Sequence, residues 1–366
     1  FVVALNKTDM VSGWKDTETQ FISSAIEKQN PEVQTFLDEK IYDVVTALSV
    51  LGYQSEAFYR INDYKKEIAI VPVSAKTGIG MPELFAVLVG LTQQYLKDKL
   101  VQEGHDHGSN LHLVHNNLSE DIAFQKVIRL AEHTETGIYF VHTTAKEGVL
   151  AVAEARAKHL PVYGEALHNY LEFTCEDYKK PEGLAIHTYP AIKYSEDRDA
   201  LLQGLVDGPI CTTATDEWTT YKEIKLAGDT IKTVCGGHNG IETRMPVTFT
   251  KLVSNGRISL RRFADITSTN AAKILGMYPQ KGAIAAGSDA DIVLIDPNIK
   301  KQLTLSDLHS DSDYSIWEGF ECHGYPVMTI LRGKVIVEDG RLVGSSRDGR
   351  WLPRKVSPSV LAQPVV

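Results

Sequence analysis

The sequence lacks the features that mark several protein classes. Its four cysteines are widely spaced and form no CxxC pair, which argues against a disulfide framework or a zinc ribbon and predicts a reducing, cytoplasmic location. No apolar run reaches the roughly 18 to 20 residues that a membrane-spanning helix needs, so we expect no membrane partner. Positive charge is also scarce. The 38 basic against 47 acidic residues give a net charge of −9, which disfavours binding along a polyanion.

What is present fits a globular chain of 366 residues, 43% hydrophobic and 23% charged. Residues 1–5 and 67–73 are short apolar runs, each followed by a polar loop, and they predict two buried parallel strands. Apolar residues recur at three- and four-residue spacing over 36–48 and 84–91, which predicts helices. This pattern is typical of α/β architecture, in which ligands bind at the carboxyl ends of strands. Because the chain begins at Phe1 inside an apolar run, we expect it to be part of a longer protein.

The loops after these two strands can recognise guanine. The Asp9 carboxylate can accept hydrogen bonds from the ring N1–H and the exocyclic amine, while Lys7 can lay its stem along the base. Asn6 can steady the loop or the base, and backbone donors of the second loop can reach the guanine carbonyl oxygen. A charged β-turn is the alternative interpretation of the first loop. The candidate nucleotide-binding residues are Asn6, Lys7, Asp9, Ser74, Ala75 and Lys76.

With the segments FVVALNKTD and IVPVSAKTGIGMPELFAVLVGLTQQYL, residues 1 to about 100 resemble the second half of the GTPase domain of archaeal and eukaryotic translation initiation factor five B. The resemblance implies GTP or GDP as a ligand and, for an intact parent protein, the ribosome as a partner. The chain has no GxxxxGK[ST] loop, no switch threonine and no DxxG segment. We therefore expect no GTP hydrolysis and at most weak nucleotide binding.

The remaining chain alternates predicted strands and helices. The strands are expected at 137–142, 161–167 and 209–216, and the helices at 145–159, at 195–207 and from a capping Ser119 onward. This order suggests part of a (β/α) barrel, whose catalytic groups lie at strand carboxyl ends. Two of the strands end in His142 and Asp216, suitable ligands for a hydrolytic metal ion, with Asp216 also able to act as a base. The alternative for His142 is a hydrogen-bonded core histidine, and the alternative for Asp216 is a helix N-cap.

The same region resembles the hydantoinase and dihydropyrimidinase branch of the amidohydrolase superfamily. The resemblance rests on YFVHTTAKEGV, ATDE, GGHNGIETRM and ITSTNAAKILGMYPQKGAIAAGSDADIVLIDP. It implies a divalent metal, most often zinc, with His142 and Asp216 as ligands. It also implies that Asp216 shuttles the proton, that a small cyclic amide or ureide is the substrate, and that intact relatives form homo-oligomers. The last strands would belong to a small β-sandwich, with Asp339-Gly340 in a hairpin turn.

The sequence departs from this family pattern in several places. The HxH motif of the first barrel strand, the carbamylated lysine and the histidine of the strand before YFVH are not found. His105 and His107 imitate HxH, but no apolar strand leads into them. Glu217 stands where many hydantoinases have histidine, and the asparagine that grips the cyclic amide is displaced around 236–239. We therefore expect weak activity or none.

Together these patterns predict an α/β chain of three parts. The parts are a partial P-loop-type GTPase sheet (1–100), the rear half of a (β/α)8 TIM-like amidohydrolase barrel (101–278) and β-sandwich strands with a tail (279–366). The expected function is metal-dependent hydrolysis of cyclic amides through an incomplete site. The alternatives are a GTP-binding fragment of an initiation factor and a non-functional chimera of two genes.

Overall fold

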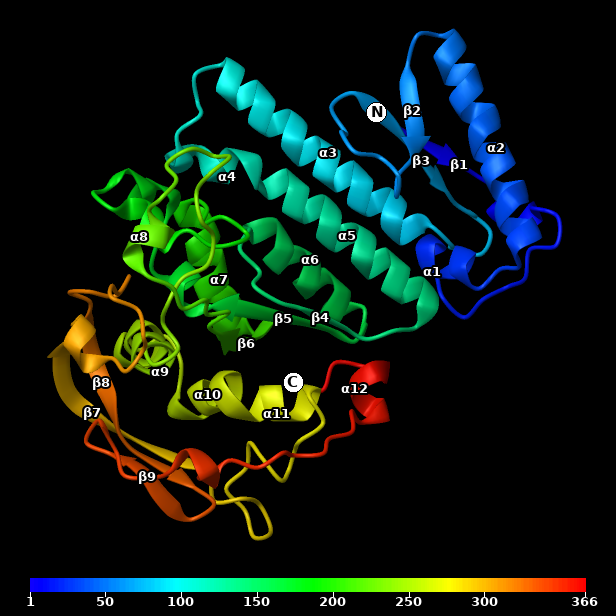
Figure 1. Ribbon diagram of the computed structural model, residues 1–366. Helices are drawn as coiled ribbons and strands as arrows, with labels where there is room; N and C mark the ends of the chain where they lie inside the picture. Colours follow the sequence, from blue (N-terminus) through cyan, green and yellow to red (C-terminus); the bar gives the residue numbers. More distant parts are fainter. The chain divides into compact units, whose positions relative to one another are not determined.

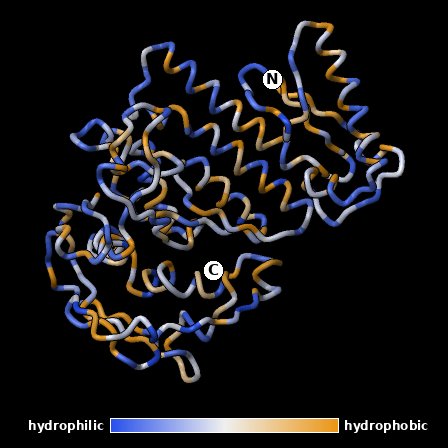
Figure 2. Tube along the Cα trace, viewed as in Figure 1, coloured by the Kyte–Doolittle hydropathy of each residue, from blue (hydrophilic) through white to orange (hydrophobic).

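A computed structural model describes residues 1–366, which form two compact units, Phe1–Gly104 and His105–Val366. The predicted domain boundaries at 100 and 278 stay predictions. Orange and blue segments alternate along the long helices in Figure 2, as expected for helices with one apolar face. No helix combines the length and the apolar character needed to cross a bilayer.

The first unit is a three-stranded parallel sheet with helices packed on it (Figure 1). Its elements are β1 (Val2–Leu5), α1 (Ile22–Glu27), α2 (Pro31–Val50), β2 (Gln54–Ala57), β3 (Glu67–Pro72) and α3 (Met81–Gln102). The strand order is β1-β3-β2, so β3 is central and buried, as predicted. β1 lies at an edge and is only half-buried, whereas we expected a buried strand. The helix α2 packs Leu37 and Ile41 against Ala57 and Ile70 of the sheet.

The second unit begins with an α/β region. Its elements are α4 (Leu111–Val114), α5 (Asn117–Thr134), β4 (Ile138–Phe140), α6 (Lys146–Ala157), β5 (Val162–Leu167), α7 (Ser195–Asp207), β6 (Ile210–Ala214) and α8 (Lys222–Lys225). The strands form an open parallel sheet in the order β4-β5-β6 and do not close into a barrel. The apolar sides of α5 and α6 meet through Phe124, Ile128 and Val152.

One predicted helix start is wrong. The helix α5 begins at Asn117, and its N-cap is Asn116, whose side chain accepts a hydrogen bond from Ser119 N at 2.9 Å. Ser119 therefore donates to the cap rather than forming it. Both residue types favour N-caps, so the choice depends on where the chain turns into the helix.

The rest of the second unit consists mainly of short helical turns and an antiparallel sheet. The helical turns are α9 (Arg244–Thr248), α10 (Leu260–Ala264), α11 (Asn270–Ile274) and α12 (Pro358–Ala362), and the strands are β7 (Ile292–Gln302), β8 (Glu321–Leu331), β9 (Lys334–Glu338) and β10 (Arg341–Leu342). The strands form one sheet in the order β10-β9-β8-β7, where we expected strands of a sandwich. Asp339 and Gly340 both have positive φ and connect β9 to β10, which confirms the predicted hairpin turn.

Candidate functional site

Polar side chains follow all three parallel strands of the second unit. His142 comes two residues after β4, His168 directly after β5, and Asp216 two residues after β6. Because the strands are parallel, these positions lie at the same edge of the sheet. His142 is half-buried and Asp216 is exposed. The structure thus brings the two predicted ligands to one edge, on either side of the strand end of β5.

Both residues adopt an unusual backbone conformation. The φ angle is 42° at His142 and 47° at Asp216, in the left-handed region that side chains other than glycine seldom adopt. Residues held in this region cluster at functional sites, where the surrounding structure maintains the strain.

Glu165 of β5 is a buried carboxylate that was not predicted from the sequence. It fixes the segment that follows β4. It accepts hydrogen bonds from Tyr139 Oη at 2.5 Å and from His142 N at 3.3 Å. The tyrosine hydroxyl also lies 2.7 Å from Thr212 Oγ1 of β6. Burial, followed by the charge of Glu165, raises the pKa of Tyr139. The hydroxyl therefore stays protonated and links three strands. The sequence did contain a signal for this role, an acidic residue inside an otherwise apolar strand. A carboxylate buried in such a strand needs hydrogen-bond partners.

Arg244, at the start of α9, reaches the end of β6. Its Nη1 donates to Thr213 O at 3.3 Å and to Thr213 Oγ1 at 3.1 Å. Burial lowers the pKa of Arg244, and the nearby Glu165 carboxylate and Tyr139 oppose that shift. A guanidinium keeps its charge under such conditions. The Arg244 guanidinium therefore adds a fixed positive charge to this end of the sheet, near the Glu165 side chain.

His168 is fully buried behind the strand ends. Its Nε2 lies 3.0 Å from Thr243 Oγ1, and its ring stacks on Trp317 with the centroids 4.8 Å apart. A Cβ on Gly240 would lie 2.9 Å from that Nε2 and from the Trp317 Nε1, so only glycine fits at this close approach. Burial, then the charges of His238 and Arg244, lower the pKa of His168 well below its usual range. His168 is therefore a neutral packing group.

The loop of residues 235–241 packs beside Asp216. Trp218 N donates to His238 O at 2.9 Å, and Ile241 N donates to the Glu217 carboxylate. The His238 side chain is fully buried without a hydrogen-bond partner, and burial, followed by the charge of Lys225, lowers its pKa to about 3.

The amide of this loop is buried and uses its hydrogen-bonding groups within the protein. Asn239 is buried, donates to Tyr314 O and accepts from Ile316 N at 3.3 Å. Its carboxamide thus fixes the loop against a neighbouring segment of the same unit.

The donor set does not fit a metal centre. No group of three His, Cys, Asp or Glu side chains lies close enough to hold a metal ion. His105 and His107 are exposed, and His107 accepts a hydrogen bond from Ser109 N at 3.1 Å, which is a local cap. Zinc needs three protein ligands in a catalytic site and four in a structural one, and the described residues supply neither set.

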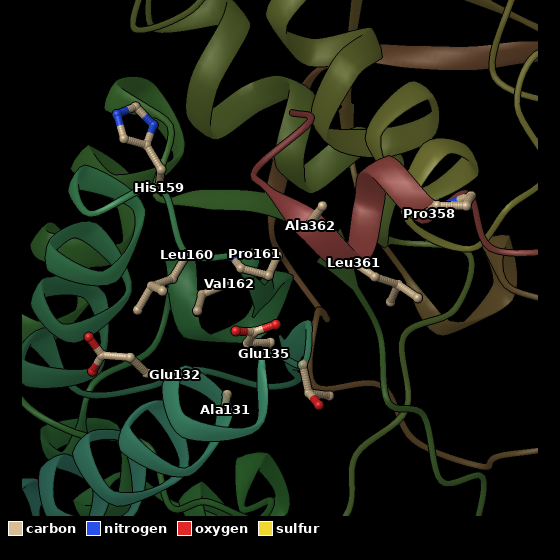
Figure 3. A pocket seen from close by; sticks show the side chains of 11 residues that line it. Ala131, Glu132, Glu135, His159, Leu160, Pro161, Val162, Pro358, Leu361 and Ala362 are labelled. Atoms are coloured by element: carbon tan, nitrogen blue, oxygen red, sulfur yellow. The ribbon is translucent and has the colours of Figure 1, made fainter.

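A cavity of about 410 Å³ lies at the opposite edge of the sheet. Figure 3 shows Leu160, Pro161 and Val162, where β5 begins, facing Leu361 and Ala362 of α12. Catalytic groups of parallel α/β folds lie at strand carboxyl ends. This cavity borders the amino ends of β4 and β5, so we assign it no part in the candidate site.

In the first unit, the two predicted nucleotide-binding loops are joined. Asn6 Oδ1 accepts hydrogen bonds from Lys7 N at 2.8 Å and from Ala75 N at 3.0 Å. Ser74 is buried, and its Oγ accepts from Thr77 N at 3.2 Å. A cavity of about 330 Å³ borders Asn6 and Lys7. The remaining candidates lie beside these residues in the chain, Asp9 half-buried and Lys76 exposed.

The second unit is thus an α/β structure with polar side chains gathered at the carboxyl ends of its strands. Comparison with known proteins identifies the family: residues 93–336 match the amidohydrolase family, more than half of the chain, and the chain belongs to it. A D-hydantoinase of Ralstonia pickettii is 36% identical over 270 residues, which are 73% of this chain and 59% of that protein. A D-phenylhydantoinase of Escherichia coli is 36% identical over 236 residues, or 64% of this chain and 51% of the relative.

Solved structures agree with this assignment. A dihydropyrimidinase from Brevibacillus agri matches with a TM-score of 0.70 and 26% identity, covering 97% of this chain and 80% of that one. An initiation factor five B from Aeropyrum pernix is 46% identical over 27% of the chain, but its TM-score of 0.26 is too low to support a conclusion. The chain spans between 51% and 59% of the length of the curated relatives it matches.

Proposed function

We propose that this chain contains the rear part of a cyclic-amide hydrolase of the hydantoinase and dihydropyrimidinase type. The observation that carries the proposal is the placement of His142 and Asp216 at neighbouring ends of one parallel sheet. The similarity to D-hydantoinases supports it. The substrate class would be a small cyclic amide or ureide.

Each residue of the site would have a limited role. Asp216 is exposed and would carry a proton to the ring nitrogen that leaves. Glu165 would hold His142 through the backbone N–H of His142, and Arg244 would fix the end of β6. Family members typically depend on a metal ion, for which zinc is the best candidate. Because the side chains present do not fit such a centre, we expect the chain alone to hydrolyse cyclic amides weakly or not at all.

Complementation tests this proposal. The chain would be co-expressed with the part of the Ralstonia pickettii D-hydantoinase that it does not match, and the mixture assayed for hydrolysis of hydantoin and dihydrouracil with added Zn²⁺. We expect activity in the mixture that Asp216→Asn abolishes, and little in the chain alone. Zinc-dependent turnover by the chain alone would refute the incompleteness of its site. A stable complex without turnover would count against the hydrolase assignment. Size-exclusion chromatography of the same samples would test the homo-oligomer expected by analogy with intact relatives.

We infer a second, weaker function for the first unit: recognition of a guanine base. The hydrogen bond from Ala75 N to Asn6 Oδ1 supports it, because it joins the two loops beside a cavity. Calorimetric titration with GDP would show weak binding that Asp9→Ala abolishes and that the exposed control Asp16→Ala retains. No heat at millimolar GDP would refute it. A role on the ribosome would require an intact parent factor.

A third proposal is that the chain is a chimera of two genes. The division between the units after Gly104 supports it, because it lies close to the change in sequence character near residue 100. A transcript read from the codon of Met81 to that of Phe124 tests it. A continuous transcript would establish a genuine fusion, and separate transcripts would establish two proteins.

A further inference from the structure

Lys225, the last residue of α8, is fully buried. Its ammonium donates to three backbone carbonyls: His187 O at 2.7 Å, Cys235 O at 2.6 Å and Gly237 O at 2.5 Å. An ammonium group has three N–H donors and no acceptor, so these three carbonyls use its whole capacity. The cage satisfies a charge that burial would otherwise strongly disfavour.

The three carbonyls belong to segments that are distant in sequence. Cys235 and Gly237 begin the loop of residues 235–241, and His187 belongs to a segment about fifty residues earlier. Burial lowers the pKa of Lys225 to about 8, so the ammonium form is still the main one at neutral pH. Lys225 therefore acts as a cationic cross-link between two loops.

The cross-linked loop packs against the residues that follow Asp216. His238 O accepts from Trp218 N at 2.9 Å, and a Cβ on Gly237 would lie 2.8 Å from the Trp218 side chain. The Glu217 carboxylate accepts from Ile241 N at the other end of the loop. A displacement of Gly237 would therefore be transmitted to the Asp216 segment.

We propose that Lys225 is a positioning residue, whose ammonium fills a carbonyl cage that fixes residues 235–241 against the segment of Asp216. The cage has the chemistry of a site for an ammonium ion, because its three carbonyls accept N–H donors. Once the side chain is removed, it should accept free ammonium or methylammonium in its place. The role toward Asp216 rests on the proposed hydrolase function, whereas the cage itself rests only on geometry.

The test compares Lys225→Ala with Lys222→Ala, a lysine of the same helix that is 41% exposed and forms an ion pair with Glu182. Hydrogen exchange at the amides of Trp218 and Ile241 is measured in the full chain, in sodium chloride and in ammonium or methylammonium chloride at equal ionic strength. We expect about tenfold faster exchange in Lys225→Ala in sodium, with slower exchange restored by ammonium, and no change in Lys222→Ala.

Unchanged exchange in Lys225→Ala in sodium chloride, or exchange that is equally fast in sodium and in ammonium or methylammonium, would overturn the proposal. Should that variant fail to fold, NMR of the unaltered protein labelled with 15N-lysine decides the question. The Lys225 ammonium protons should exchange slowly with water at neutral pH, and fast exchange would overturn the proposal. Neither measurement uses hydrolysis, so a failure here is distinct from a failure of the proposed function.

Discussion

Breaking the buried ion pair at the start of α6 should destabilise the second unit. Lys193 Nζ lies 3.2 Å from Glu120 Oε2, with side chains 1% and 8% exposed. The Glu120 carboxylate also accepts from Thr144 N and Ala145 N, each at 2.8 Å, and thus caps the first turn of α6. We predict that Lys193→Met strongly destabilises this unit.

The size of the stability loss depends on the interactions that the Glu120 carboxylate keeps in Lys193→Met. Removing one partner of a buried pair leaves an uncompensated charge and costs about 3 to 5 kcal/mol. The helix N-terminus offsets this by about 0.3 to 1 kcal/mol, because it favours a negative charge. A second buried carboxylate, Asp197, accepts from Lys146 N at 2.8 Å in the same turn, and its proximity limits the offset. We therefore expect a loss of about 3 kcal/mol.

Urea denaturation measures this loss from the transition midpoint and slope. The control is Lys179→Met, which breaks an exposed pair with Glu176 and should cost less than about 1 kcal/mol. Adding Glu120→Gln to Lys193→Met should recover part of the stability, because the uncompensated charge of Glu120 is then removed. Our reasoning would be refuted if Lys193→Met cost no more than the control, or if the double variant were less stable than Lys193→Met.

Three further predictions concern single positions. Asn116→Ala should lower the free energy of unfolding by about 1 kcal/mol through loss of the α5 cap, measured by urea denaturation. The pKa of His238 is about 3 in the folded chain against 6.5 in the unfolded one, so only the unfolded chain gains its proton between these values. The free energy of unfolding should therefore fall as pH drops from 6.5 toward 3, by up to about 1.4 kcal/mol per unit, and less steeply in His238→Gln. Finally, His142→Gly should leave stability unchanged or raise it by about 1 kcal/mol in thermal denaturation, while abolishing hydrolysis in the complemented mixture.

Much of the fold could be predicted because its strands are apolar and its helices are periodic. The central strand β3 and the strands β5 and β6 all coincide with predicted apolar runs. The strand β2 was missed because its sequence, QSEA, has no apolar pattern, and an edge position does not require one. The open sheet of the second unit could not be predicted either. The spacing of apolar residues indicates separate strands but does not show how many of them pair.

The placement of the candidate site was only half predictable. The positions of His142 and Asp216 at one edge of the sheet could be predicted, because polar residues that follow apolar strands lie at the carboxyl edge of a parallel sheet. Glu165 was missed because its partners Tyr139 and Thr212 lie on other strands, and only the pairing of the strands brings them together. Lys225 lies in KEIK, a sequence typical of an exposed helix, and nothing local indicates that three distant carbonyls surround it.

The backbone after β4 allows the main chain and the side chain of His142 to be tested separately. A positive φ at a residue other than glycine costs of order 1 kcal/mol and persists only where neighbouring contacts maintain it. His142 has such a contact, because its N–H donates to the buried Glu165 carboxylate. That bond uses the backbone alone, so glycine at position 142 would keep the bond and relieve the strain. Relief of this strain should offset the larger backbone entropy that glycine loses on folding, so His142→Gly should cost no stability and should report on the side chain alone.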